Sequence, residues 1–364
     1  MNDEAKKIIS AFYPYTNEFY SIDKYADAIV DFDVVFFITP PGITVPLSSH
    51  KITNTLPDEN IDTLLLGYDS YYSMQFDKTY FKIIKEAIDR GINICFISDF
   101  SKLDIEQVLD YNQKHNNVKI SMLRSGGHYK NFTTDISPII VPINCPVVFV
   151  TSAMEHTRKF EVELGLYISF LKKGYNVQLV ASKPYAEIFG VFPFPNFMFN
   201  EALEKSKIIN FNVFLKSIEY NTNPDLIIVG IPGTIMKFNN NIVNNFGITA
   251  LEISRAVRPD IVVFNLNYDP NYDNESLECV YSECSHIFGV SPSCVCIADS
   301  QLDTSMVSNG VLTFLYASDE KVDELASSLT NDKRIVVPAL SNQGIETVAE
   351  FMEDILSDDS VLIV

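Results

Sequence analysis

The sequence lacks the glycine patterns that mark common dinucleotide-binding loops and serine hydrolases. Only 14 of its 364 residues are glycine, and they form neither a Gly-x-Gly-x-x-Gly nor a Gly-x-Ser-x-Gly motif. The first motif lets a backbone approach a pyrophosphate, and the second exposes a nucleophilic serine at a strand-to-helix turn. The sequence therefore indicates neither a dinucleotide site nor a nucleophile elbow.

Basic residues are also scarce. Lys and Arg number 27 against 47 Asp and Glu, which gives a formal net charge of −20. Nonspecific binding to nucleic acid or to anionic lipid depends on clustered cations, so we expect neither partner. No apolar run reaches the roughly 20 residues that a membrane span needs, and the first residues lack a signal-peptide pattern. We therefore expect a cytoplasmic protein.

Six cysteines in a chain of this length do not indicate a disulfide scaffold. The closest group consists of Cys279, Cys284, Cys294 and Cys296, with His286 among them. Their spacings differ from the paired Cys-x-x-Cys of zinc sites. We expect free thiols and no metal site.

The first part of the chain alternates strand-like apolar runs with helix-like segments. A helix that stops at Gly91 and leads into the apolar run 93–98 is typical of a β-α-β unit. The pattern predicts helices over 78–90 and 103–115, and strands over 7–13, 33–39, 63–66, 93–98 and 118–123. We interpret residues 1–140 as a small Rossmann-like domain with a parallel sheet.

A proline-rich link over 135–146 leads into a second α/β domain, which we assign to residues 141–364. The pattern predicts strands over 147–150, 176–181, 224–230, 259–265, 294–298, 311–316 and 334–338. It predicts helices over 159–173, 202–220, 248–257, 278–289 and 345–356, and a shorter helix that ends near 190. An apolar loop at 192–195 either packs on this domain, which we favour, or forms a partner surface. The fold class is therefore α/β with two parallel-sheet domains.

The stretch 146–166 has the layout of a phosphate-binding loop. A buried strand, an eight-residue polar connection and a lysine at the helix start, Lys159, follow one another. Ala153 and Arg158 stand at the glycine positions, and Phe160 stands where a Mg²⁺-binding Ser or Thr is expected. Loops of this kind often need positive φ, which Ala and Arg adopt poorly. The sequence predicts a P-loop-NTPase-like domain with a degenerate phosphate loop.

A second loop, 230–247, follows the buried strand 224–230. P-loop proteins carry an acidic residue at this strand end to order Mg²⁺ and water, whereas this chain has Gly230. Lys237 and five asparagines follow, and their amides both donate and accept hydrogen bonds. The loop either holds a peptide backbone or polar small molecule, or is a solvated turn.

The candidate ligand-binding residues come from these two loops, with Asn265, Asn267 and Asp299 expected at neighbouring strand ends. In this hypothesis Lys159 and Arg158 neutralise phosphate charge, and His156 moves a proton. The alternative is a solvated lysine in the first helical turn and an exposed histidine. The candidates are Ser152, His156, Thr157, Arg158, Lys159, Gly233, Lys237, Asn239, Asn240, Asn244 and Asn245.

Two resemblances extend this interpretation. The order of strands and helices from Lys159 to Gly230 resembles the P-loop domain of the dethiobiotin-synthetase-like group. The chain as a whole resembles the clostridial natural-product peptide-maturation protein family, encoded beside Cys-rich peptide precursors and radical-SAM maturases. The stretches that carry this second resemblance are 13–20, Lys159-Phe160, 230–233 and 244–247. It implies a role in making a ribosomally synthesised peptide such as a bacteriocin.

Two hypotheses follow. In the first, the chain is an accessory protein that binds a precursor peptide, a nucleotide or a radical-SAM maturase through its degenerate P-loop-like domain. In the second, it is an ATP-dependent enzyme that activates a carboxylate or transfers a phosphoryl group, with ATP or GTP and Mg²⁺ as cofactors. The sequence assigns no catalytic residue.

Overall fold

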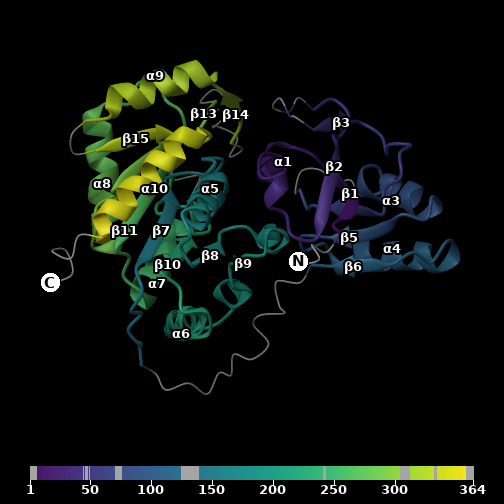
Figure 1. Ribbon diagram of the computed structural model, residues 1–364, viewed down its shortest axis with the longest axis horizontal. Coiled ribbons are helices and arrows are strands. Elements are labelled where there is room, and N and C mark those ends of the chain that lie inside the picture. The colour runs from purple at the N-terminus through teal and green to yellow at the C-terminus, as the bar shows by residue number, and fades with distance from the viewer. Residues whose placement is uncertain are drawn as a thin grey trace. The chain divides into compact units, whose positions relative to one another are not determined.

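The chain forms two compact units, each built on a parallel sheet. The computed structural model describes residues 6–43, 45, 48, 50–69, 76–123, 139–240, 243–303, 312–331 and 334–357 (Figure 1). The first unit consists of residues 1–128 with Pro184–Pro193, and the second consists of residues 129–183 with 194–364. The two sheets have six and seven strands. The predicted α/β fold class is confirmed.

The first sheet has the strand order of the Rossmann fold, β3-β2-β1-β4-β5-β6. Every pairing in it is parallel. The sequence analysis located all of these strands within a few residues except β3, whose three residues form no apolar run. The strands are β1 (Ile8–Tyr13), β2 (Phe32–Ile38), β3 (Lys51–Thr53), β4 (Thr63–Leu66), β5 (Asn93–Phe96) and β6 (Ile120–Met122).

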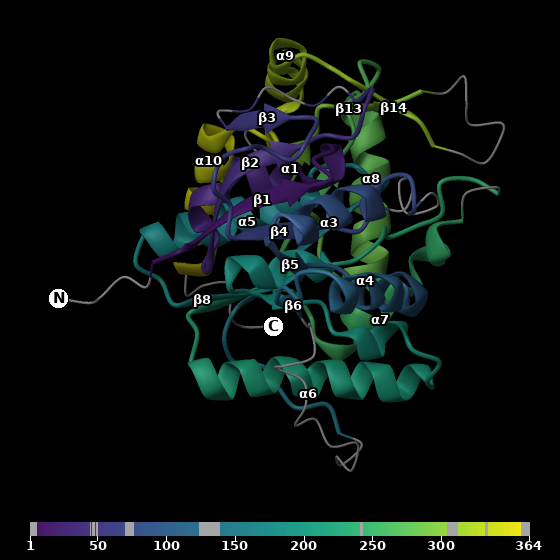
Figure 2. The same cartoon turned by 90° about the vertical axis from the view of Figure 1, so that its right-hand side faces the viewer.

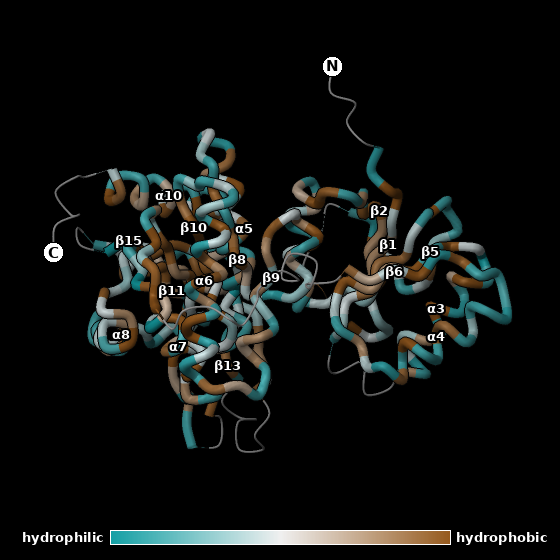
Figure 3. Tube along the Cα trace, turned by 90° about the horizontal axis from the view of Figure 1, so that it is seen from below, coloured by the Kyte–Doolittle hydropathy of each residue, from teal (hydrophilic) through white to brown (hydrophobic). Residues whose placement is uncertain are grey.

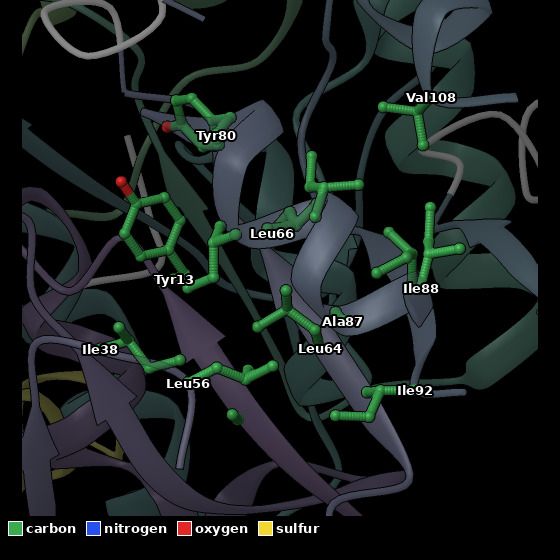
Figure 4. Packing of buried hydrophobic residues seen from close by; sticks show 14 of the residues in the cluster. Tyr13, Ile38, Leu56, Leu64, Leu66, Tyr80, Ala87, Ile88, Ile92 and Val108 are labelled. Atoms are coloured by element: carbon green, nitrogen blue, oxygen red, sulfur yellow. The ribbon is translucent and has the colours of Figure 1, made fainter. Parts of the chain in front are cut away.

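Two amphipathic helices, α3 (Tyr80–Asp89) and α4 (Lys102–Lys114), contribute to the core on one face of this sheet. Alternate strand residues such as Tyr13, Ile38 and Leu66 belong to one buried cluster with Tyr80, Ala87 and Ile88 of α3 (Figure 4). Side chains alternate between the two faces of a strand, so the residues in between need a different cover.

That cover comes partly from a distant segment. The rings of Phe12 and Phe19 lie 5.1 Å apart, and the ring of Phe19 lies 5.1 Å from that of Tyr185. The backbone N–H of Val30 donates to the carbonyl of Ile188 at 3.1 Å. We had assigned residues 184–193 to the second domain, whereas they pack with the short helix α1 (Tyr20–Lys24) in the first unit. The expected short helix here is a 3-10 segment, η3 (Pro184–Phe189).

The second sheet has the strand order β15-β12-β11-β7-β10-β8-β9. The pairings from β15 to β8 are all parallel, and β7 lies between β10 and β11. The strands are β7 (Val147–Ser152), β8 (Val177–Ala181), β9 (Phe192–Pro193), β10 (Leu226–Gly230), β11 (Ile261–Leu266), β12 (Cys294–Ile297) and β15 (Ile335–Pro338).

Helices lie on both faces of this second sheet. α5 and α10 are on one face, and α7 and α8 are on the other (Figure 3). α6 runs beside α7 (Figure 2). The helices are α5 (Lys159–Lys172), α6 (Glu204–Thr222), α7 (Ile248–Ala256), α8 (Asn274–Phe288), α9 (Asp319–Leu329) and α10 (Asn342–Ser357). In the part of the chain that the structure describes, no helix is long and apolar enough to cross a membrane.

Two local expectations in this unit need correction. The predicted strand 311–316 is the shorter β14 (Phe314–Tyr316), which pairs antiparallel with β13 (Ser300–Leu302) outside the main sheet, and Val311 lies outside the described residues. The helix α9 was not predicted, although its buried residues follow helical spacing, namely Val322, Leu325, Ala326 and Leu329.

Candidate functional site

The candidate site lies at the carboxyl edge of the second sheet, where β7 ends at Ser152. The neighbouring strands β10 and β11 end beside it at Gly230 and Leu266. In open α/β sheets, ligands bind outside the carboxyl ends of the strands. Residues 153–158 connect β7 to α5, so the predicted strand, loop and helix are present in that order, although β7 runs on to Ser152 and the connection is shorter than the predicted eight residues.

Arg158 takes the left-handed backbone conformation of a glycine position. Its φ is +55°, and that of His156 is +58°. Nε and one terminal nitrogen of its guanidinium donate to the two oxygens of Asp299, at 2.7 and 2.9 Å. Burial opposes the charge of Arg158, yet the hydrogen bonds to Asp299 and the charge of Glu161 raise its pKa above the ordinary value. The guanidinium of Arg158 therefore stabilises the loop by binding Asp299 and is not available to a ligand.

Side chains from the end of β11, the residue after it and β13 hold the end of β7 and the remainder of this loop. The amide of Asn265 donates to the carbonyl of Thr151 at 2.9 Å, and the amide of Asn267 donates to that of Glu155 at 3.1 Å. The hydroxyl of Ser300 donates to the carbonyl of His156 at 2.5 Å. The sequence analysis anticipated the two asparagines as strand-end residues, but no signal pointed to Ser300.

Lys159 is the first residue of α5, and its ammonium is held by the opposite loop. Nζ donates to the carbonyl oxygens of Ile231 and Gly233, the latter at 2.7 Å, and to Oγ of Ser152 at 3.5 Å. Burial lowers the pKa of Lys159 to about 8, while the charge of Glu163 acts in the opposite direction. The alternative of a solvated first-turn lysine is wrong, because these contacts use all three ammonium protons.

Glu163 lies one helical turn after Lys159 and is completely buried. Its Oε2 accepts a hydrogen bond from the backbone of Ser182 at 2.9 Å, whereas Oε1 has no hydrogen-bond partner among the described residues. A side chain at Gly230 would meet this carboxyl group, since a Cβ there would lie 2.1 Å from its carbon. Burial raises the pKa of Glu163 to about 7, and the charge of Lys159 lowers it in part.

The sequence analysis did not single out Glu163. The signal was present, because this acidic residue interrupts the apolar positions of the helix at Val162 and Leu164 and lies four residues after Lys159. Residues four apart share a helix face.

The Asn-rich loop makes mostly local contacts. Nζ of Lys237 donates to the side chain of Asn240 at 3.1 Å, and the amide of Asn244 donates to the carbonyl of Met236 at 3.3 Å. Asn239 is partly buried and Asn245 is exposed, while Asn241 lies outside the described residues. The structure therefore brings Ser152, Lys159 and Gly233 together, whereas the hydrogen bonds found for Lys237 and Asn244 do not reach them.

Residues 244–247 form a left-handed turn. Asn244, Asn245, Phe246 and Gly247 have φ angles of +47°, +50°, +53° and +70°. Asparagine and glycine tolerate this region, but phenylalanine does so at a cost. The Phe246 ring is 62% exposed, so it does not compensate this cost by burial.

The residues at the sheet edge do not fit Mg²⁺ with a nucleoside triphosphate. Phe160 is buried at the position of the metal-binding hydroxyl, and Gly230 offers no carboxylate. Throughout the described ranges, no group of three or more His, Cys, Asp or Glu residues is placed to hold a metal ion. Of the cysteines considered above, Cys279 is exposed, while Cys284, Cys294 and Cys296 are buried.

Comparisons with known proteins show a likeness in fold and none in sequence. No family model and no curated protein matches the chain. A DUF1611 family protein from Anabaena variabilis aligns over 96% of this chain and 100% of its own, with a TM-score of 0.54 and 10% identity. A LAO/AO transport system kinase aligns over 81% of this chain and 77% of its own, with a TM-score of 0.32 and 9% identity. The first likeness extends over both units, and at this identity it shows the fold alone.

Proposed function

We propose that this chain is an accessory protein in the maturation of a ribosomally synthesised peptide. In this proposal the second unit keeps a phosphate-loop fold as a binding scaffold and does not hydrolyse nucleotides. The observation that carries the scaffold role is the state of Lys159, whose ammonium is bonded to the carbonyls of Ile231 and Gly233. A lysine that binds phosphate presents these protons to the ligand.

The other charges at the sheet edge support the same proposal. Arg158 is paired with Asp299 through two hydrogen bonds, so a phosphate would have to displace a bidentate carboxylate. Glu163 is buried beside Gly230, so a carboxyl group and not a cation fills the space at the end of β10. The peptide partner is supported by the sequence resemblance, carried by stretches 13–20, 230–233 and 244–247.

A second candidate is an ATP-dependent enzyme with an atypical phosphate loop. The observation that favours it is the left-handed backbone of Arg158, directly before Lys159. A phosphate loop needs this conformation at its last glycine, so the path of the backbone is compatible with a bound phosphate. Release of Lys159 from two carbonyls would then have to accompany nucleotide binding.

Calorimetric titration with ATP and GTP, with and without Mg²⁺, separates the two candidates. We expect no binding of either nucleotide at millimolar concentration, because both cations of the loop are already paired within the protein. A Cys-rich candidate precursor peptide, titrated in the same way, is expected to bind.

The variant Lys159→Ala serves as the decisive comparison, and Lys172→Ala is its control, since Lys172 is an exposed lysine at the far end of the same helix. Mg²⁺-dependent nucleotide binding that disappears in Lys159→Ala and survives in Lys172→Ala would establish the enzyme candidate instead. If the protein binds neither the nucleotides nor the precursor peptide, the proposed accessory role is refuted.

A further inference from the structure

A second polar cluster lies in the first unit. It includes Tyr15, from the stretch 13–20 that plays no part in the site above. Its centre is the carboxylate of Asp23, a residue that is only 6% exposed. Tyr15 donates its hydroxyl proton to Oδ2 at 2.5 Å, and Ser48 donates to Oδ1 at 2.6 Å. The third partner is Nδ1 of His50, 2.7 Å from Oδ1.

This arrangement sets the tautomer of His50. A carboxylate only accepts hydrogen bonds, so Nδ1 carries the proton and Nε2 keeps its lone pair. The backbone N–H of His50 donates to Oγ of Ser48 at 2.9 Å, which ties His50 to a second member of the cluster. On one side the imidazole contacts the buried ring of Phe37, with 5.4 Å between ring centres.

The imidazole is nevertheless open to a ligand. The His50 side chain is 29% exposed, and its Nε2 has no hydrogen-bond partner among the described residues. Tyr15 reaches the cluster from the carboxyl ends of β1 and β2, because it follows β1 and its backbone N–H donates to the carbonyl of Ile38, the last residue of β2, at 2.8 Å. His50 directly precedes β3 and therefore lies beside β2 at the amino end of its own strand. The carboxyl ends of the strands are the ligand-binding side of a Rossmann-like sheet, and the cluster adjoins this side through Tyr15.

We propose that His50 and Asp23 form a general-base site for the hydroxyl group of a neutral ligand. In this site Nε2 of His50 takes the hydroxyl proton, and Asp23 is a positioning residue that holds the ring and stabilises the imidazolium. The hydrogen-bonding groups of Tyr15 and Ser48 are engaged with Asp23, which leaves them poorly placed to bind an anion. The proposal does not depend on the function of the second unit.

The simplest hydroxyl donor is water, and the probe is the hydrolysis of p-nitrophenyl acetate by the full chain. His50 removes a proton from water while the electron pair of the broken O–H bond stays on oxygen. That oxygen attacks the acyl carbon, and nitrophenolate leaves with the electron pair of the ester bond. The imidazolium and the newly formed acetic acid each release one proton to solvent, so acetate and nitrophenolate are the products.

We expect His50→Gln to lower the steady-state turnover by at least about tenfold, since a positioned base contributes on the order of 10²–10⁴. Asp23→Asn is expected to lower the rate and to displace its pH profile, which a merely structural role would not do. His115→Gln is the matched control, because Nδ1 of His115 also bonds an oxygen, the carbonyl of Tyr111 at 2.8 Å, but no carboxylate.

Nitrogen-15 NMR of the imidazoles tests the geometry separately from turnover. At pH 8 the Nε2 of His50 should carry no proton, and in Asp23→Asn this preference should weaken. Turnover that is equal in wild type, His50→Gln and His115→Gln would overturn the proposal, as would a His50 ring protonated on Nε2 in the neutral form.

Discussion

At the scale of single residues, the environment decides what each charged side chain does. Arg158 occupies a glycine position, and its left-handed backbone costs about 1–2 kcal/mol. The bidentate contact with Asp299 offsets this strain, since paired, largely buried charges with two hydrogen bonds stabilise one conformation of the loop. The same residue type on an open loop would remain available to a phosphate.

Glu163 provides a prediction at this scale. Its folded-state pKa, about 7, exceeds its ordinary value, so between about pH 4.5 and 7 the folded state binds more protons than the unfolded state. The stabilising contribution of the protonated group is complete below about pH 4.5 and is lost as the pH rises through 7. We expect the Glu163-dependent part of the unfolding free energy to fall by up to about 1.4 kcal/mol per pH unit in this window.

Urea denaturation at pH 5 and pH 8 measures this effect. Glu163→Gln should remove the decrease, so the variant gains stability relative to wild type as the pH rises. Glu350→Gln, an exposed change on α10, should follow the wild-type curve. Parallel pH curves for wild type and Glu163→Gln would contradict the assignment of the raised pKa.

At the scale of elements, the short segments after the strands position the site more than the helices do. The chain after β10 turns at Gly233, with φ of +73°, and so directs the carbonyls of Ile231 and Gly233 at Lys159. The later left-handed turn, 244–247, returns the chain to Ile235. Gly247 is in contact there with the backbone, and an added Cβ would lie 1.9 Å from the carbonyl oxygen of Ile235.

Gly247→Ala is therefore expected to destabilise the second unit by at least about 2 kcal/mol, through both the clash and the positive φ. Gly174→Ala is the control, since Gly174 has φ of +92° but no atom within 4 Å of an added Cβ, and so it carries only the backbone cost. Thermal unfolding of the two variants gives the comparison. Equal losses in both would mean that the close approach to Ile235 contributes nothing.

At the scale of the whole molecule, the order of segments along the chain differs from their order in the fold. Residues 184–193 lie within the sequence of the second unit and pack with the first. Tyr185 is 2% exposed, and its hydroxyl donates to the carbonyl of Glu18 at 3.0 Å. The first unit therefore depends for its core on a segment that follows it by more than 50 residues.

We expect Tyr185→Ala to destabilise the first unit by about 3–5 kcal/mol, the usual cost of removing a buried aromatic ring. Tyr220→Ala, which removes a ring that is 86% exposed, should change stability by less than about 0.5 kcal/mol. Hydrogen exchange at the amides of β1 reports on the first unit directly. Unchanged protection of β1 in Tyr185→Ala would show that this segment does not stabilise the unit.

Local patterns were sufficient for most elements and for the layout of the phosphate-binding loop. The apolar runs of β7 and β10 indicate buried strands, and the glycine after α3 indicates the end of a helix. Both signals lie in residues that are adjacent in the sequence. For the same reason the sequence indicated Ser152 and Lys159 as parts of one loop, since they lie seven residues apart. Two elements were not predicted, α9 in spite of its helical spacing and β3 because it is too short to show a pattern.

The partners of the charged groups were decided only by the tertiary structure. Asp299 lies 141 residues after Arg158, and Gly233 lies 74 residues after Lys159, so no local pattern records that either pair meets. Asp23 and His50 were missed because their properties come from burial and from contacts across segments. Glu163 had a local signal, its place between the apolar helix positions Val162 and Leu164. The sequence by itself determined two parallel α/β units and a loop of phosphate-binding layout. Long-range packing determined that the cations of this loop hold the protein's own oxygens, because a charge removed from water needs the nearest opposite charge or dipole.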